Sequence, residues 1–254
     1  MQPDSPILEF DPTREAVVEP SKAIKDRDLP EHCVLCFFYD VISTLTLDSR
    51  VEKLLPIKSE IGDHSVCALS EGGQRLAVCH VGVGAPLAGA MLEELIARGS
   101  RKFIACGSAA VLNREIASDH LVVPSTAVRD EGTSYHYLPP AREVAAHPAA
   151  VQAIETVLRE HHCPYLTGKT WTTDAIFRET AQKVQLRKSE GCVTVEMEAA
   201  AFFAVAQFRQ VILGQILYAG DDVSGIEWNP REFFKRGPIR EQIFWLAAEA
   251  CLRL

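Results

Sequence analysis

The sequence predicts an α/β protein, a three-layer α/β/α sandwich around a central mixed β-sheet. Apolar, β-prone runs alternate with helical patterns along most of the chain, as expected when helices cover both faces of a buried sheet. Hydrophobic residues fill 47% of the 254 positions, enough for one sizeable core. Because no repeat or low-complexity linker divides the chain, we expect an N-terminal arm over residues 1–30 and a single domain over residues 31–254.

In the first half of the chain, turn and cap residues mark the elements. The hairpin signal Glu71-Gly72-Gly73-Gln74 joins two strands. An amphipathic helix has Pro86 in its first turn and ends before Gly99. The expected elements are strands over residues 32–39, 64–69, 75–81, 103–106 and 119–126 and a helix over residues 86–98.

In the second half, the pair His147-Pro148 precedes a helix, and an Ala-rich run predicts another helix directly after a short β-prone segment. The expected elements are helices over residues 148–161, 198–208 and 237–253 and strands over residues 165–171, 192–195 and 211–219.

Charge and hydropathy exclude several classes of function. The net charge is −8 and no Lys/Arg-rich run occurs, so a nucleic-acid partner is not expected. No apolar run has transmembrane length, and the first 30 residues carry acids and prolines instead of a signal-peptide core, so no membrane partner is expected. We expect a cytoplasmic protein.

The cysteines predict buried, reduced thiols, because most of the eight lie inside apolar runs. Cys33 and Cys36 have the spacing of a redox or zinc half-site, but no second such pair follows and adjacent strand residues face opposite ways. Structural cysteines are therefore favoured over a redox enzyme, and neither a metal nor an organic cofactor is expected.

Small or acidic residues follow five of the expected strands. Ligand sites in such sheets gather at the carboxyl ends of strands, so these segments are expected to meet. They are Gly82-Val83-Gly84, Gly107-Ser108, Thr173-Asp174, Glu196-Met197-Glu198 and Asp221-Asp222.

The Glu-Met-Glu segment is the most informative of the five. A Glu at a strand end accepts hydrogen bonds from two adjacent hydroxyls, as a sugar diol requires, and Met adds an apolar surface. A capped helix that enters the core is the alternative. In the pair Asp221-Asp222, mutual repulsion is expected to raise the pKa of one acid, which suits a general acid, with a capped turn as the alternative.

Taken in order, these segments resemble the nucleoside phosphorylase family, which includes hexameric purine nucleoside and uridine phosphorylases and methylthioadenosine/adenosylhomocysteine nucleosidases. The resemblance covers residues 75–225, and Val128–His136 is similar to uridine phosphorylases in particular. It implies a nucleoside phosphorylase-like fold, a homo-oligomer (dimer or hexamer), and cleavage of the N-glycosidic bond of a nucleoside. Inorganic phosphate would be the co-substrate, and free base and ribose 1-phosphate the products.

The resemblance also implies roles for individual residues. Ribose binding falls to Met197 and Glu198 with Glu196 in the same pocket, base contacts to Val195, Ile176 and Phe177, and the phosphate side to Gly82, Gly84 and Ser108. The catalytic acid falls on Asp222, with Asp221 beside the base where a Ser usually stands. Because an acid at this position serves the N7 atom of a purine, a purine nucleoside is favoured.

Two departures from the family pattern concern the nucleophile. Arginines that bind phosphate are expected in the loop at residues 37–40 and at position 105, yet the loop reads Phe37-Phe38-Tyr39-Asp40 and position 105 is Ala105. Candidates for compensation are Arg50, Arg101 and Arg129.

Three alternatives therefore stay open. Asp40 is a candidate base for activating water, which would make the protein a hydrolytic nucleosidase. A nucleoside-binding protein without turnover is another reading. His136 and Arg178 are further candidates for the site, His136 through a subunit interface.

Overall fold

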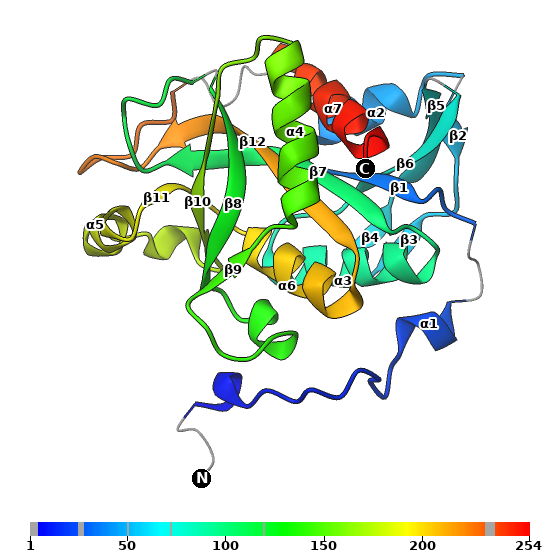
Figure 1. Ribbon diagram of the computed structural model, residues 1–254, viewed down its shortest axis with the longest axis horizontal. Coiled ribbons are helices and arrows are strands. Elements are labelled where there is room, and N and C mark those ends of the chain that lie inside the picture. The colour runs from blue at the N-terminus through cyan, green and yellow to red at the C-terminus, as the bar shows by residue number, and fades with distance from the viewer. Residues whose placement is uncertain (1–4, 25–27, 50, 72, 119, 232–236) are drawn as a thin grey trace.

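A mixed sheet crosses the centre of the molecule (Figure 1). The structure, a computed structural model, describes residues 5–24, 28–49, 51–71, 73–118, 120–231 and 237–254. The strands are β1 (His32–Cys36), β2 (Glu52–Lys53), β3 (Ile57–Ser59), β4 (Gly62–His64), β5 (Val66–Glu71), β6 (Gln74–His80), β7 (Lys102–Val111), β8 (Leu121–Asp130), β9 (Glu143–Ala145), β10 (Tyr165–Thr173), β11 (Cys192–Glu196) and β12 (Ile212–Asp222).

The strand order is β11-β10-β8-β12-β7-β1-β6-β5-β2, with β9 paired to β8 and with β3 and β4 as a separate hairpin. The pairs β6–β1, β1–β7, β7–β12, β8–β10 and β10–β11 are parallel. An antiparallel contact between β11 and β7 closes β7, β12, β8, β10 and β11 into a ring. The ring brings the carboxyl ends of β7, β11 and β12 to one region.

Helices cover both faces of the sheet. They are α1 (Pro20–Ala23), α2 (Tyr39–Leu45), α3 (Ala85–Ala97), α4 (Pro148–Glu160), α5 (Ala181–Ser189), α6 (Ala199–Arg209) and α7 (Gly237–Leu252), with short 3₁₀ turns η1 (Pro6–Leu8), η2 (Thr133–His136) and η3 (Ile176–Arg178). One core cluster joins α2, α4 and α7 to the sheet, and a second joins α3 and α6 to its other face. The predicted three-layer fold is confirmed.

Several elements differ from the prediction. β7 continues through Gly107 and Ser108 to Val111, although the sequence predicts a turn there, and β12 extends to Asp222. The helices α2 and α5 and the short strands β2, β3, β4 and β9 were not predicted. α5 is rich in Lys, Arg and Gln and buries only two residues, so it lacks the apolar stripe that marks a helix in a sequence.

A register shift interrupts the end of β12. Pairing with β7 is regular as far as Ala219 opposite Ala109, and then Asp222 pairs with Val111. β12 therefore holds one more residue than β7 over this interval, which is a β-bulge at Gly220 and Asp221. The bulge breaks the simple alternation of side chains between the two faces of the strand.

The N-terminal segment lies along the layer of α3 and α6 (Figure 1). Arg209 of α6 pairs with Glu19 at 3.2 Å and with Glu93 of α3 at 2.8 Å, which ties the segment to both helices. The arm over residues 1–30 stays a prediction, and residues 1–4 and 25–27 of it lie outside the described ranges, as do Gly72 of the hairpin and Asp119 of the expected fifth strand. Within the described ranges, no helix has the length and apolar character needed to cross a bilayer.

Candidate active site

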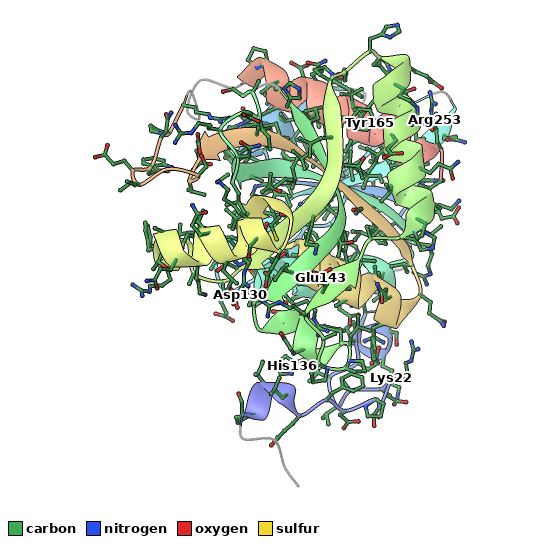
Figure 2. All side chains as sticks on the ribbon, turned by 60° about the vertical axis from the view of Figure 1, so that its left-hand side comes forward. Lys22, Asp130, His136, Glu143, Tyr165 and Arg253 are labelled. Carbon is green, nitrogen blue, oxygen red and sulfur yellow. The ribbon has the colours of Figure 1, made fainter. Side chains whose placement is uncertain are left out.

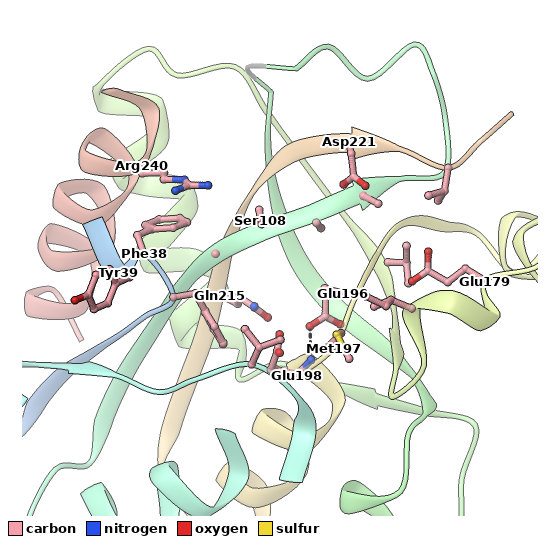
Figure 3. Close-up of a pocket in the computed structure, with 18 of the residues that line it drawn as sticks. Phe38, Tyr39, Ser108, Glu179, Glu196, Met197, Glu198, Gln215, Asp221 and Arg240 are labelled. Atoms are coloured by element: carbon pink, nitrogen blue, oxygen red, sulfur yellow. Dashed lines mark hydrogen bonds between the residues drawn. The ribbon is translucent and has the colours of Figure 1, made fainter. Parts of the chain in front are cut away.

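A cavity of about 870 Å³ opens where β1, β7, β11 and β12 end (Figure 3). This volume lies within the usual range of small-ligand sites, roughly 300–1,000 Å³. Its lining comes from residues 37–40 after β1, from Val83, from residues 107–110 of β7, from residues 176, 177 and 179 after β10, from residues 195–198, from residues 215, 221, 223 and 228, and from Arg240 of α7. The cavity gathers most of the residues predicted for the site.

Glu196 holds the start of α6 in place. Its Oε2 accepts hydrogen bonds from the N–H groups of Glu198 and Ala199, both at 2.7 Å, and its Oε1 accepts one from the Thr172 hydroxyl at 2.6 Å. These backbone donors have no partner inside the helix, so a carboxylate beside them satisfies the helix terminus. Glu196 lines the cavity as predicted, but its oxygens are already engaged.

Glu198 presents its carboxylate to the cavity from the N-cap position of α6. Oε1 accepts the N–H of Gly84 at 2.5 Å, and the residue is 6% exposed. Burial, and next the charge of Glu196, raises the pKa of Glu198 well above its ordinary value. Met197 borders the cavity beside it. This pair has the acceptor and the apolar surface that the sequence predicts for a sugar site.

The two glycines of the loop after β6 act through the backbone. Gly84 has φ 98° and caps α3 while its N–H holds Glu198. Gly82 has φ 74°, and a Cβ there would lie 2.5 Å from Leu87 Cδ2. Of this loop, Val83 lines the cavity, whereas Gly82 and Gly84 do not. The predicted contact of these two glycines with phosphate is therefore not supported. The Gly84 amide is, in addition, already engaged by Glu198.

Acidic and apolar residues line one end of the cavity. Asp221 accepts a hydrogen bond from Trp228 Nε1 at 2.7 Å. Glu179 faces the same space, and burial together with the charge of Asp221 raises the pKa of Glu179 to about 7. Ile176 and Phe177 border this end and are 47% and 93% exposed. Val195 also lines the cavity.

The structure separates Asp222 from the cavity. Beyond the bulge, its side chain lines a different hollow, accepts the N–H of Ser224 at 2.8 Å and pairs with Arg231 at 3.4 Å. Burial alone would raise the pKa of Asp222. The hydrogen bonds from Ser224 and the contact with Arg231 lower this pKa below its ordinary value. A carboxylate held ionised in another hollow does not fit the predicted general acid. The neighbouring Asp221 occupies the position in the cavity.

The other end of the cavity is lined by a positively charged side chain. Arg240 lines it together with Ser108 and Asp40, and Nη1 of Arg240 lies 3.4 Å from Asp40 Oδ1. Nε of Arg240 donates to the Tyr218 hydroxyl at 3.3 Å, and the guanidinium lies 5.7 Å from the centre of the Phe38 ring.

The arginines named in the sequence as replacements lie elsewhere. Arg101 donates to the carbonyls of Ile96 and Ser100. Arg129 is buried and donates to the carbonyls of Leu138 and Pro139. Neither lines the cavity, and Arg50 lies outside the described residues.

Two further candidates are also absent from the cavity lining. Arg178 is exposed on η3. His136 lines a hollow beside the N-terminal arm with Thr13 and Arg14 (Figure 2).

Sequence reasoning gave no role in the site to Glu179, Gln215 or Arg240, although all three line the cavity. Glu179 follows Phe177 by two positions, so its place in the same turn was a usable signal. Gln215 is a polar residue inside an apolar strand run, which is a signal for a buried functional group. Arg240 belongs to a helix without a motif, and only the packing of α7 against β1 and β7 brings it here.

Comparisons with known proteins agree with this geometry. A family model described as "Phosphorylase superfamily" matches residues 45–237. A guanosine phosphorylase from Halorubrum lacusprofundi is 29% identical over 158 residues, which are 61% of this chain and 64% of that protein. A uridine phosphorylase from Treponema pallidum is 29% identical over 153 residues, 56% of this chain and 59% of the relative. The chain thus spans less than two thirds of the length of these relatives.

One solved structure extends the likeness across the whole fold. The crystal structure of purine nucleoside phosphorylase from Toxoplasma gondii in complex with immucillin-H has a TM-score of 0.79 at 18% identity. The match covers 95% of this chain and 98% of that one. At this identity the likeness shows a shared fold.

Proposed function

Because the chain belongs to the phosphorylase superfamily, we propose that it cleaves the N-glycosidic bond of a purine nucleoside with inorganic phosphate as the nucleophile. The observation that supports this best is the placement of Glu198, Met197 and Asp221 around one cavity at the strand ends. A sugar acceptor and a group for the leaving base are both required for this chemistry.

Glu198 binds the ribose in this proposal. One oxygen of its carboxylate is fixed by the Gly84 amide, so the group is oriented before substrate arrives. The 2′- and 3′-hydroxyls donate to the carboxylate, and Met197 packs against the sugar. A positioned acceptor of this kind lowers the barrier because little reorganisation is needed during the reaction.

Asp221 and Glu179 act on the base. As the C1′–N bond breaks, its electron pair moves onto the base, and a proton or hydrogen bond at a ring nitrogen stabilises that charge. Two neighbouring carboxyls readily share one proton, and the pKa of Glu179, raised to about 7 by burial and by Asp221, suits proton transfer near neutral pH. A purine offers N7 as the acceptor.

Phosphate completes the reaction from the side of Ser108. One of its oxygens forms a bond to C1′ while the C1′–N bond breaks, and the products are ribose 1-phosphate and the free base. Positive charge that develops on the sugar lies beside the incoming phosphate.

A homo-oligomer in the cytoplasm is the proposed state of the enzyme. Large apolar side chains at the mouth of the cavity are strongly exposed in the single chain, among them Tyr39 at 73%, Phe177 at 93% and Trp228 at 58%. A second copy of the chain would cover them. All eight cysteines are free, which suits a reducing compartment. Light scattering of the purified protein tests the oligomer.

Hydrolysis is the second candidate, because Asp40 lines the cavity and is exposed to solvent there. A carboxylate at this place could take a proton from an attacking water. The two functions differ in their need for phosphate.

The test is a panel of inosine, guanosine, adenosine and uridine incubated with and without phosphate, with free base and ribose 1-phosphate measured. We expect base release from the purines only when phosphate is present. Glu198→Gln should lower kcat/KM about 10²-fold or more, whereas the exposed Glu115→Gln, in a loop outside the cavity lining, should match the wild type. Release without phosphate would favour hydrolysis, and binding without release would leave a binding protein.

A further inference from the structure

The cavity contains a buried amide whose hydrogen-bonding groups have no partner. Gln215 is 1% exposed, and neither Nε2 nor Oε1 has a hydrogen-bond partner among the described residues. The side chain lines the cavity and points into it in Figure 3. A buried amide without a partner is unfavourable, so a polar ligand is the natural partner for it.

Gln215 lies beside the position from which the family arginine is missing. In the parallel pair of β12 and β7, Gln215 is directly opposite Ala105, so the two side chains project to the same face. Ala105 is a fully buried residue of the core cluster around α3 and α6 and offers no donor. The small side chain of Ala105 leaves this side of the cavity to the longer Gln215.

Arg240 supplies the positive charge. Among the described residues that line the cavity, it is the only Lys or Arg. Its ion pair with Asp40 is long, at 3.4 Å, and the Asp40 side chain is 46% exposed, so this pair is weak and replaceable. A guanidinium carries five N–H donors, and the contacts with Asp40 and Tyr218 leave others for a ligand.

We propose that Arg240, Gln215 and the Ser108 hydroxyl form the phosphate subsite of this cavity, in place of the arginines expected at residues 37–40 and 105. This inference rests on the proposed function. A charged fork, an amide NH₂ and a hydroxyl together suit a tetrahedral dianion. In Figure 3, Arg240 and Glu179 lie on opposite sides of Glu198, which leaves the sugar between the phosphate and the base.

Asp40 is an internal counter-ion in this arrangement. Phosphate competes with the Asp40 carboxylate for the charge of Arg240, so Asp40 lowers the affinity for phosphate. Asp40→Asn should therefore bind phosphate more tightly. In the hydrolytic alternative the same substitution would remove the base and abolish turnover, so this variant distinguishes the two roles.

The test measures the KM for inorganic phosphate at saturating nucleoside. Arg240→Gln should raise it about 10- to 100-fold and Gln215→Met by a smaller factor, with the nucleoside KM little changed. Asp40→Asn should lower it. The control is Arg253→Gln, which removes an arginine that pairs with Glu160 and Glu249 outside the cavity (Figure 2). It should leave both KM values unchanged.

Phosphate binding without nucleoside keeps this inference separate from the proposed function. A titration of inorganic phosphate followed by ³¹P NMR should show saturable binding to the wild type that weakens in Arg240→Gln and strengthens in Asp40→Asn. That result sustains the subsite even if no nucleoside turns over. The inference is overturned if the wild type does not bind phosphate, or if Arg240→Gln and Asp40→Asn bind it as the wild type does. Because Asp40 is exposed, its variant provides the answer should Arg240→Gln fail to fold.

Discussion

Asp221 and Asp222, the two adjacent acids at the end of β12, should respond differently to substitution. Asp221→Asn should lower turnover, and Asp222→Asn should lower stability. Asp221→Asn removes the ionisable group from the cavity but keeps an oxygen that can accept the Trp228 hydrogen bond. Loss of general acid or hydrogen-bond assistance should lower kcat about 10²- to 10⁴-fold. The fold should be nearly as stable as before, because the contact with Trp228 survives.

Asp222→Asn should affect stability more than catalysis. The amide oxygen can still accept the Ser224 N–H, but the attraction to Arg231 at 3.4 Å is lost, and both side chains of that pair are only 11% exposed. Removing the charge from a partly buried pair costs about 1–3 kcal/mol. For a chain of this size, that corresponds to a Tm lower by roughly 2–12 °C. We expect kcat to stay within about threefold, because substitutions away from the reacting groups leave the barrier unchanged.

The assay follows release of free base at saturating nucleoside and phosphate, with Tm measured on the same preparations. An N7-methylated purine nucleoside serves as the control substrate, because its base already carries a positive charge and needs no proton to depart. Asp221→Asn should lose much less activity on it than on the unmodified nucleoside. If Asp222→Asn loses turnover while Asp221→Asn keeps it, the assignment of Asp221 is wrong.

The remaining predictions concern protonation, the start of α6 and the mouth of the cavity. Burial and the charge of Glu196 raise the pKa of Glu198 from 4.5 to about 8, so the folded state holds this proton more tightly than the unfolded state. The resulting stabilisation is complete below pH 4.5 and is lost as pH rises through about 8. In urea titrations at several pH values, the free energy of unfolding of Glu198→Gln should therefore depend less on pH than that of the wild type. Thr172→Val removes the donor to Glu196 at 2.6 Å and the acceptor for the Ala200 N–H at 3.0 Å. It should lower the free energy of unfolding by about 2–4 kcal/mol, and Thr172→Ser should retain most of it. Phe177→Ala should raise the nucleoside KM about 3- to 10-fold with an unchanged phosphate KM, and Phe177→Tyr should not. If Phe177→Ala keeps the wild-type KM for the nucleoside, stacking of Phe177 on the base is excluded.

Much of the fold could be predicted from local patterns. Alternating apolar strands and helices, together with Pro86 and Gly99, marked most elements within a few residues. The strand-end rule also placed Glu196, Met197 and Glu198 at the cavity, where β11 ends. These successes share a cause, since each depends on residues that are close together in the sequence.

The misassigned features depend on contacts between distant segments. The choice between Asp221 and Asp222 follows from the register of β12 against β7, which no local pattern of β12 contains. Arg240 reaches the cavity only because α7 packs against β1 and β7. The Gly84 amide was predicted for phosphate but pairs with a carboxylate 114 positions further on.

The extra residue near the end of β12 determines which chemical environment each of two identical side chains enters. Removing Gly220 would restore regular pairing and could exchange the two acids without altering the number of carboxyl groups. Comparison of homologous chains by residue identity alone would then misassign the acid that faces the cavity. Aligning such chains by backbone hydrogen-bond register should reveal which acid faces the cavity in each of them.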